Sequence, residues 1–328
     1  MITLGIESSC DETSIAVLHD TEIVVNHIYS QVEHVCFGGV VPEIASRAHL
    51  EKIDRLATAA LNEASLSLRD IDLLAVTDCP GLAGALLVGV SFALGIHNGW
   101  NIPVTGVNHL EGHIFSSMLE NPGLSFPFLA LVVSGGHTAI YKVMEIGCYE
   151  CLGQTVDDAA GEAFDKVGKM LGFAYPAGRA IEQEAAASPE DASGIRFPIA
   201  KVNGNPFDFS FSGLKTAVKY FLSNKDPDYI RENRPSICRA FQKAVADSLM
   251  SKLSAASHKT GIKDAALVGG VACNGEIRRQ MKILFGDRAH FPRPGLCTDN
   301  AAMIALAGYK RSLKNLTRFP RMEPSKGL

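Results

Sequence analysis

The feature that most constrains the fold is a pair of similar hairpins whose first strands begin about 125 residues apart. Residues 2–18 contain an apolar strand, a polar turn at 7–12 and a returning strand. Residues 128–143 repeat this order around a turn of small polar residues at 134–137. Short apolar runs bounded by polar turns predict strands. A unit repeated at a long interval indicates internal duplication, so we expect two similar lobes.

Strands and helices alternate after the first hairpin, which is typical of an α/β lobe. The expected elements are helices at 42–64, 82–96 and 274–284, strands at 73–77 and 265–268, and a mostly helical region at 157–259 that a polar stretch at 189–212 interrupts. Two α/β lobes that each open with such a hairpin would bind a ligand in the cleft between them. We therefore predict a two-lobed α/β protein.

Length and charge exclude several classes of protein. The chain has 328 residues, of which 47% are hydrophobic and 20% charged, and a net charge of −4. This fits two globular domains and excludes collagen-like and disordered chains. A near-neutral protein does not bind nucleic acid with its whole surface, so a nucleic-acid substrate would need local patches or partners. Residues 309–328 hold six Lys and Arg against one Glu, which predicts either a small patch that attracts nucleic acid or a solvated tail.

The eight cysteines show no framework spacing, which predicts reduced thiols in a cytoplasmic protein. Cys148 and Cys151 could form a redox or metal pair, but we expect small buried side chains. No signal peptide is visible at the N-terminus. The apolar stretch 81–96 is shorter than the roughly 20 residues that span a bilayer, so we expect a buried helix and no membrane association.

Two glycine-rich turns have the chemistry of phosphate-binding loops. Ser134, Gly135 and Gly136 follow a strand, and backbone amides without nearby Cβ atoms can approach an anion closely. Gly269 and Gly270 end another strand before a helix. An ordinary hairpin turn and an ordinary strand-to-helix turn explain the same residues, so both interpretations stay open at this point.

His109 and His113 are spaced as helical metal ligands. At 100° per residue the two side chains lie about 40° apart on one face of a helix, whereas Glu111 lies about 200° from His109. The Glu position excludes the zinc-peptidase arrangement, in which the Glu directly follows the first His. A carboxylate would complete a facial triad, and Asp299 is the candidate.

Nine ordered motifs resemble one family, the universal tRNA threonylcarbamoyl transferases, whose bacterial form is called TsaD and was once described as an O-sialoglycoprotein endopeptidase. The similarity reaches from the N-terminus to about Gly308. The motifs are residues 5–14 (GIESSCDETS), 39–47 (GVVPEIASR), 80–86 (PGLAGAL), 108–113 (NHLEGH), 133–138 (VSGGHT), 153–166 (GQTVDDAAGEAFDK), 208–215 (DFSFSGLK), 269–274 (GGVACN) and 297–303 (CTDNAAM).

The resemblance implies the fold of actin, sugar kinases and chaperone ATPases, the ASKHA fold. The N-terminal lobe would span 1–123, joined by a C-terminal helix at 299–328, and the other lobe 124–298, with a helical insertion at about 157–259. The implied reaction transfers a threonylcarbamoyl group from threonylcarbamoyl-AMP to N6 of adenosine 37 in tRNAs that read codons starting with A, releasing AMP. An adenine nucleotide, threonylcarbamoyl-AMP or ATP, would occupy the cleft.

The resemblance also implies roles for single residues. His109, His113 and Asp299 would hold one divalent metal, Fe²⁺ in the family. The residues expected to contact the adenylate and its acyl group are Val132, Val133, Ser134, Gly135 and Gly136. Those expected at the ribose are Asp165, Gly178 and Glu182, and the residue expected at the adenine is Asn274. Asp11 and Glu12 in the first turn are candidates to orient or deprotonate the amine.

One motif departs from the family. The usual Tyr-Pro-Gly-Gly-Pro reads Tyr-Pro-Ala-Gly-Arg here, with Ala177 and Arg179 at the altered positions. Arg179 would be near the ribose, where it could contact a phosphate or simply lie at the surface.

The resemblance implies partners and leaves two alternatives. The implied partners are tRNA, a degenerate TsaB-like paralogue and a TsaE-like P-loop ATPase, while a TsaC-type enzyme supplies the adenylate.

The alternatives are an ATP-dependent small-molecule kinase or nucleotide-switched module of the same fold, and a metallopeptidase. A kinase would not need paired helical histidines, and the position of Glu111 argues against the peptidase.

Overall fold

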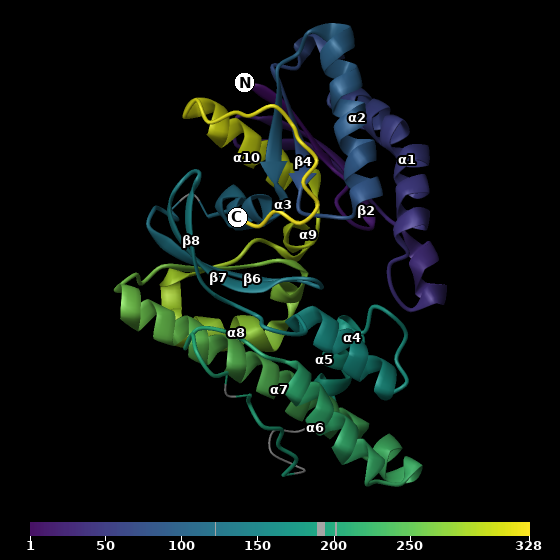
Figure 1. Cartoon of the computed structure of the whole chain (residues 1–328), viewed down its shortest axis with the longest axis vertical. Coiled ribbons are helices and arrows are strands. Elements are labelled where there is room, and N and C mark those ends of the chain that lie inside the picture. The colour runs from purple at the N-terminus through teal and green to yellow at the C-terminus, as the bar shows by residue number, and fades with distance from the viewer. Residues whose placement is uncertain (122, 189–193, 201) are drawn as a thin grey trace. The chain divides into compact units, whose positions relative to one another are not determined.

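The computed structural model describes residues 1–121, 123–188, 194–200 and 202–328. The chain forms two compact units (Figure 1). Unit 1 comprises Met1–Gly123, Glu145–Tyr149 and Pro292–Leu328, and unit 2 comprises Leu124–Met144 and Glu150–Phe291. Each unit contains one of the two predicted hairpins. The predicted lobe boundaries at residues 123 and 298, and a ligand cleft between the lobes, stay predictions.

Unit 1 is built on a five-stranded sheet with the order β3-β2-β1-β4-β5. The strands are β1 (Ile2–Glu7), β2 (Glu12–His19), β3 (Glu22–Ser30), β4 (Leu73–Cys79) and β5 (Val104–Asn108). The helices are α1 (Pro42–Glu63), α2 (Ala83–Trp100), α3 (His109–Ser116), α9 (Pro294–Cys297) and α10 (Ala301–Leu313). Helices α1 and α2 pack on one face of the sheet and α10 on the other (Figure 1).

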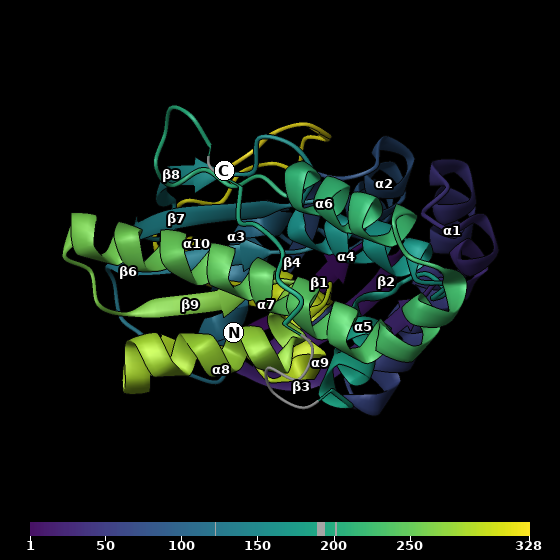
Figure 2. The same ribbon diagram turned by 90° about the horizontal axis from the view of Figure 1, so that it is seen from below.

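Unit 2 contains a second five-stranded sheet, β10-β9-β6-β7-β8. The strands are β6 (Phe128–Val133), β7 (Thr138–Glu145), β8 (Cys148–Gln154), β9 (Ala265–Val268) and β10 (Ala289–His290). The helices are α4 (Ala160–Met170), α5 (Gly178–Ala186), α6 (Ser212–Ser223), α7 (Pro227–Thr260) and α8 (Gly275–Phe285). Helices α7 and α8 lie side by side (Figures 1 and 2).

The two sheets share one topology, as the duplicated hairpins predict. In each sheet the central strand, β1 or β6, pairs antiparallel with the strand that follows the turn and parallel with a later strand, β4 or β9. Strand β4 in turn pairs in parallel with the edge strand β5, and β9 pairs in parallel with the edge strand β10. The predicted α/β fold class is therefore confirmed.

Three predictions about elements need correction. The helix expected over 299–328 ends at Leu313, and the tail beyond it is not helical. Helix α2 is not fully buried: it is long and apolar enough to cross a membrane by length and composition, and 28% of its residues are buried. Its outward face leaves Leu87 54% exposed. Cys148 and Cys151 are exposed rather than buried, although all eight cysteines are free thiols as predicted.

The helical region predicted at 157–259 contains α4 to α7. The polar interruption predicted at 189–212 lies partly outside the described residues; from 202 to 211 the chain is not helical, and α6 begins at Ser212.

Candidate functional site

The first candidate site, in unit 1, begins where β5 runs directly into α3. Asn108 caps the helix, because its side-chain oxygen accepts hydrogen bonds from the amides of Leu110 and Glu111 at 2.8 and 3.4 Å. His109 and His113 therefore sit on the first two turns of a helix, as their spacing predicts. Both imidazoles are buried.

Asp299 joins the two histidines from the other end of the sequence. Its Oδ1 lies 3.1 Å from His113 Nε2 and 3.5 Å from His109 Nε2. One ligand atom from each of the three residues lies within 4.8 Å of the others. The structure thus brings together the three residues whose proximity primary structure alone could not establish.

Helix α10 holds Asp299 in place. Asn300 caps α10 by accepting a hydrogen bond from the Met303 amide at 3.1 Å. The helix packs directly on β1, because Gly5 has no side chain: a Cβ at that position would lie 2.2 Å from the Ala301 carbonyl oxygen. This close approach holds Asp299, two residues before the helix, beside α3.

The donor set fits a divalent cation. Both ring nitrogens of His113 are buried and form no hydrogen bond with any residue that the structure describes, although Nε2 lies 3.1 Å from Asp299 Oδ1. A buried nitrogen without such a bond is costly, and a cation bound at Nε2 would remove this cost at one of the two atoms. Two imidazoles and one carboxylate form the ligand set of 2-His-1-carboxylate centres.

Glu7 is a fourth member of the site that the sequence analysis did not assign. It is fully buried, and its Oε2 lies 3.1 Å from His109 Nδ1. The same carboxylate accepts hydrogen bonds from the Thr77 hydroxyl and the Ser9 amide, both at 2.5 Å. Burial would raise the pKa of Glu7, but the charge and the hydrogen bond of His109 outweigh it and lower this pKa. A carboxylate that bonds to Nδ1 leaves the other ring nitrogen of His109, Nε2, available to bind a metal.

The candidate residues Asp11 and Glu12 lie near this group. Burial raises the pKa of Glu12 to about 10, and the negative charges of Asp299 and Asp11 act in the same direction. Several carboxyl groups therefore share one region of unit 1, and a bound cation would reduce their repulsion.

Glu111 is not available to act as a peptidase base. Its fully buried carboxylate accepts two hydrogen bonds from Arg311, at 2.7 and 2.8 Å, and one from the Tyr149 hydroxyl at 2.5 Å. The carboxylate is thus held in a structural ion pair. Arg311 itself is not part of a solvated patch.

The second candidate site, in unit 2, is the turn between β6 and β7. The Ser134 amide donates to the His137 carbonyl at 2.8 Å, which closes the turn. Gly135 and Gly136 are exposed at its tip, whereas the side chains of Val132 and Val133 are fully buried. An adenylate could therefore touch the turn, while the two valines can only shape the strand behind it.

Helix α4 begins against this turn. The Gly161 amide donates to the Ser134 carbonyl at 3.2 Å, and a Cβ on Gly161 would lie 2.6 Å from that oxygen. The Thr138 hydroxyl accepts a hydrogen bond from the Ala160 amide at 2.9 Å. The start of a helix so close to a glycine turn directs positive backbone dipoles toward it, which favours a phosphate.

Hydrogen bonds link the predicted ribose and adenine residues. Asp165 accepts a bond from the Ala177 amide at 2.7 Å, next to Gly178 at the start of α5. One turn later, Glu182 accepts a bond from the Gly275 amide at 2.6 Å, next to Asn274. Burial raises the pKa of Asp165. These contacts connect α4, α5 and α8 around the four predicted positions.

Asn274 is 6% exposed, and its side chain is largely used by the protein. The oxygen accepts from the Glu276 and Ile277 amides at 3.1 and 3.2 Å, and the amide group donates to Gln242 at 2.8 Å. One of its two amide hydrogens remains for a base.

The sequence model of the TsaD family, described as tRNA N6-adenosine threonylcarbamoyltransferase, matches residues 22–306. The chain belongs to the TsaD family. A protein from Geotalea uraniireducens named tRNA N6-adenosine threonylcarbamoyltransferase is 50% identical over 313 residues, covering 94% of this chain and 90% of the relative. A protein of the same name from Thermodesulfovibrio yellowstonii is 46% identical over 96% of this chain and 95% of its own length. This TsaD-family chain is therefore a transferase.

Solved structures support the fold assigned to this TsaD-family chain. HypF from T. kodakarensis aligns with a TM-score of 0.65 at 13% identity, covering 98% of this chain and 48% of HypF. Component A of the Acidaminococcus fermentans (R)-2-hydroxyglutaryl-CoA dehydratase aligns with a TM-score of 0.57 at 17% identity, covering 95% and 99%. The predicted actin-like fold is confirmed.

The departure from the TsaD motif has a structural context. Ala177 is buried, with φ −94° and ψ −10°, a conformation that needs no glycine. Arg179 is exposed and forms no ion pair with the residues that the structure describes. Gly178 begins α5, so the altered motif still starts the helix.

Proposed function

We propose that this chain transfers the threonylcarbamoyl group of threonylcarbamoyl-AMP to N6 of adenosine 37 in tRNAs that read codons starting with A, and releases AMP. The observation that carries the proposal is the convergence of His109, His113 and Asp299 in a chain of the TsaD family. An exocyclic amine is a weak nucleophile, so the acyl carbon arrives activated as a mixed anhydride. The protein must then stabilise the charge that develops on it.

We assign the metal to the first candidate site. His109, His113 and Asp299 would hold one divalent ion, for which we propose Fe²⁺, with Glu7 orienting His109. When bound, such an ion supplies a Lewis acid and a template for the acyl-adenylate. Asp11 and Glu12 are the candidates to orient the attacking amine by accepting its hydrogen bonds.

We assign the nucleotide to unit 2. The exposed turn at Ser134, Gly135 and Gly136 would bind the phosphate and acyl portion with backbone amides, backed by Val132 and Val133. Asp165 and Glu182 would accept hydrogen bonds from the ribose beside Gly178, and Asn274 would donate its remaining amide hydrogen to the adenine. The same pocket could bind ATP, which this assignment treats as an alternative occupant.

We further propose that the enzyme acts in the cytoplasm with a TsaB-like paralogue and a TsaE-like P-loop ATPase, and receives its adenylate from a TsaC-type enzyme. The net charge of −4 supports the need for partners, because tRNA binding depends on clustered positive charge.

The test is reconstitution. The full chain, its partners and a divalent metal are incubated with threonylcarbamoyl-AMP and unmodified tRNA, and the nucleosides are then weighed by mass spectrometry. We expect threonylcarbamoyladenosine from the wild-type protein, and loss of both bound metal and product in His109→Ala. The exposed His19, in the same unit, gives the matched control His19→Ala, which should retain both. A metal-loaded wild-type complex that makes no product would overturn the proposal.

The kinase alternative predicts a different result. A phosphoryl-transferring enzyme would consume ATP in the absence of tRNA and would keep this activity when His109 loses its metal. The peptidase alternative is disfavoured by the ion pair that occupies Glu111.

A further inference from the structure

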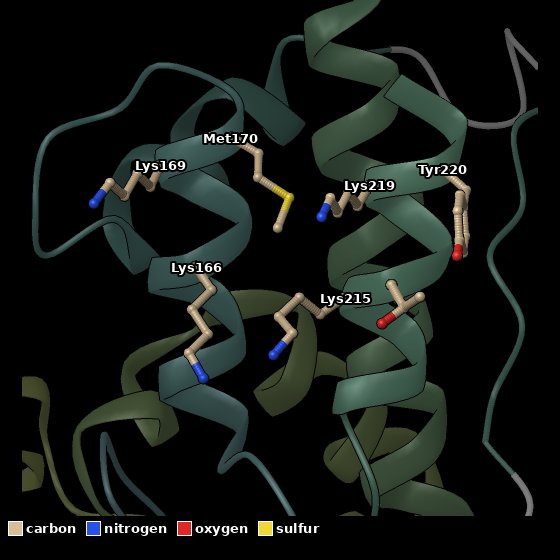
Figure 3. A pocket seen from close by; sticks show the side chains of 7 residues that line it. Lys166, Lys169, Met170, Lys215, Lys219 and Tyr220 are labelled. Atoms are coloured by element: carbon tan, nitrogen blue, oxygen red, sulfur yellow. The ribbon is translucent and has the colours of Figure 1, made fainter. Parts of the chain in front are cut away.

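A pocket lined by lysines lies between α4 and α6 in unit 2, and none of its lining residues has a role in the sites assigned above. We call it the α4–α6 lysine pocket. Its volume is about 580 Å³, and Figure 3 shows the side chains that line it. The main lining residues are Lys166, Lys169 and Met170 from α4, and Lys215, Lys219 and Tyr220 from α6. None of the described lining residues is acidic.

Two of the four lysines are held by carboxylates in the first turn of α4 and just before it. Asp158 lies 2.7 Å from the ammonium of Lys166 and 2.5 Å from that of Lys215, and Glu162 lies 2.7 Å from Lys166. These ion pairs fix the two helices side by side. Four lysines against two carboxylates leave the cluster with a charge of +2, although the whole chain carries −4.

The remaining two lysines, Lys169 and Lys219, carry this excess. Both are exposed, and neither forms an ion pair with any residue in the described part of the chain. Lys219 points across the gap toward Met170, whereas Lys169 points away from α6 (Figure 3). Two unpaired ammonium groups that point in different directions can each bind a different phosphate of an extended chain, whereas they cannot easily bind one small anion together.

The pocket also offers an aromatic surface. Tyr220 is 66% exposed at its border, where its ring lies on the side of α6 turned away from α4 (Figure 3). Lysines next to an exposed aromatic ring are the combination with which proteins bind single-stranded RNA, because the cations contact phosphates and the ring stacks on a base.

The position relative to the second candidate site adds a further argument. Helix α4 starts against the Ser134 turn through the Gly161 amide, 3.2 Å from the Ser134 carbonyl. At a rise of 1.5 Å per residue, Lys166 and Lys169 lie about 8 and 12 Å further along the same helix. Nucleotides that flank a base held near the turn would pass within reach of these lysines.

We propose that the α4–α6 lysine pocket binds the phosphodiester backbone of the RNA substrate next to the reacting nucleotide. Lys169 and Lys219 contact the phosphates, and Lys166 and Lys215, held by Asp158, supply the surrounding positive field. This inference rests on the proposed function for the identity of the RNA. It also identifies a local basic patch of the kind that a protein with a negative net charge needs in order to bind RNA.

The test compares charge-reversed variants of the full chain in its partner complex. Binding of labelled, unmodified tRNA is measured over a series of salt concentrations for wild type and for Lys169→Glu/Lys219→Glu. We expect the affinity of the double variant to fall on the order of tenfold or more, and the slope of log affinity against log salt to fall by about 2, since each lost phosphate contact removes about 1. The KM for tRNA should rise while affinity for threonylcarbamoyl-AMP stays unchanged.

The matched control is Lys259→Glu/Lys263→Glu, which makes the same change of charge at two exposed lysines of the same unit outside the pocket. We expect this control to bind tRNA nearly as tightly as wild type. The inference is wrong if the two double variants lose affinity equally, or if the pocket variant binds tRNA like wild type.

Loss of adenylate affinity with unchanged tRNA binding would identify a small-anion site instead and also overturn the inference. Failure of the proposed function is a separate result, because it would be seen as the absence of modified nucleoside from a wild-type complex that still binds tRNA.

Discussion

At the scale of single residues, the candidate metal site depends on a carboxylate that does not touch the metal position. Glu7 ends β1 and reaches His109 through a hydrogen bond of 3.1 Å, while Thr77 and Ser9 fix its own orientation. Such a carboxylate selects the histidine tautomer whose other nitrogen can bind a cation. Glu7 is therefore a positioning residue.

Glu7→Gln should weaken the binding of a divalent metal about 10- to 100-fold, the usual effect of losing the hydrogen-bond partner of a metal-binding histidine. The measurement is a metal titration of the folded protein by calorimetry. Glu63→Gln provides the control, because Glu63 bonds to His27 at 2.8 Å on the surface of the same unit. Equal metal affinity in wild type and Glu7→Gln would contradict the role given to Glu7.

At the scale of elements, the alanine of the altered motif in unit 2 packs against a glycine of the neighbouring helix, which has no side chain. Ala177, before α5, packs against α4 at Gly168, where an added Cβ would lie 2.1 Å from that of Ala177. The pair fixes how closely α4 and α5 approach, and these helices hold the predicted ribose residues Asp165 and Gly178. The usual family residue at position 177 is glycine, which would leave more room.

Gly168→Ala should therefore destabilise unit 2 by about 1 to 2 kcal/mol, because overpacking of 1 to 3 kcal/mol exceeds the gain in helix propensity. In the Ala177→Gly background the same change should be nearly neutral. A double-mutant cycle measured by thermal unfolding should give a coupling energy of about 1 to 2 kcal/mol. Additive effects of the two substitutions would show that the two helices do not meet at this pair.

At the scale of the whole molecule, unit 1 is assembled from both ends of the chain. The tail after α10 returns to the sheet, where Arg318 makes two hydrogen bonds of 2.5 Å to the fully buried Asp78. The amides of Arg321 and Glu323 also donate to Asp78, at 3.0 Å each, the first to its carboxylate and the second to its carbonyl. Arg318 of the basic tail therefore has a structural role. Neither of the two interpretations of the tail, a tRNA-steering patch or a solvated tail, predicts this role.

Arg318→Gln should lower the free energy of unfolding of unit 1 by about 3 kcal/mol, because it leaves a buried carboxylate without its charged partner. Trp100 is the only tryptophan of the chain and lies in unit 1, so its fluorescence during urea unfolding follows this unit. Arg321→Gln, in the same tail but with an exposed side chain, should change stability by less than about 0.5 kcal/mol. Similar losses in both variants would contradict the structural role of Arg318.

The sequence by itself determined both hairpins, the main helices and the local geometry of the histidine pair. Hydrophobic runs and polar turns located both hairpins, because strand formation and turn chemistry are local properties. The four-residue spacing placed His109 and His113 on one helical face for the same reason. The motifs identified the family and, through it, the fold.

Only the tertiary structure decided which distant residues meet. Asp299 reaches the histidines because Gly5 lets α10 lie on β1, and Glu7 reaches His109 because β1 and β5 belong to one sheet. The lysine pocket joins helices about 50 residues apart, and the tail folds back onto Asp78. Such contacts depend on how elements pack, and packing is set by steric fit between segments that no local pattern in the sequence records.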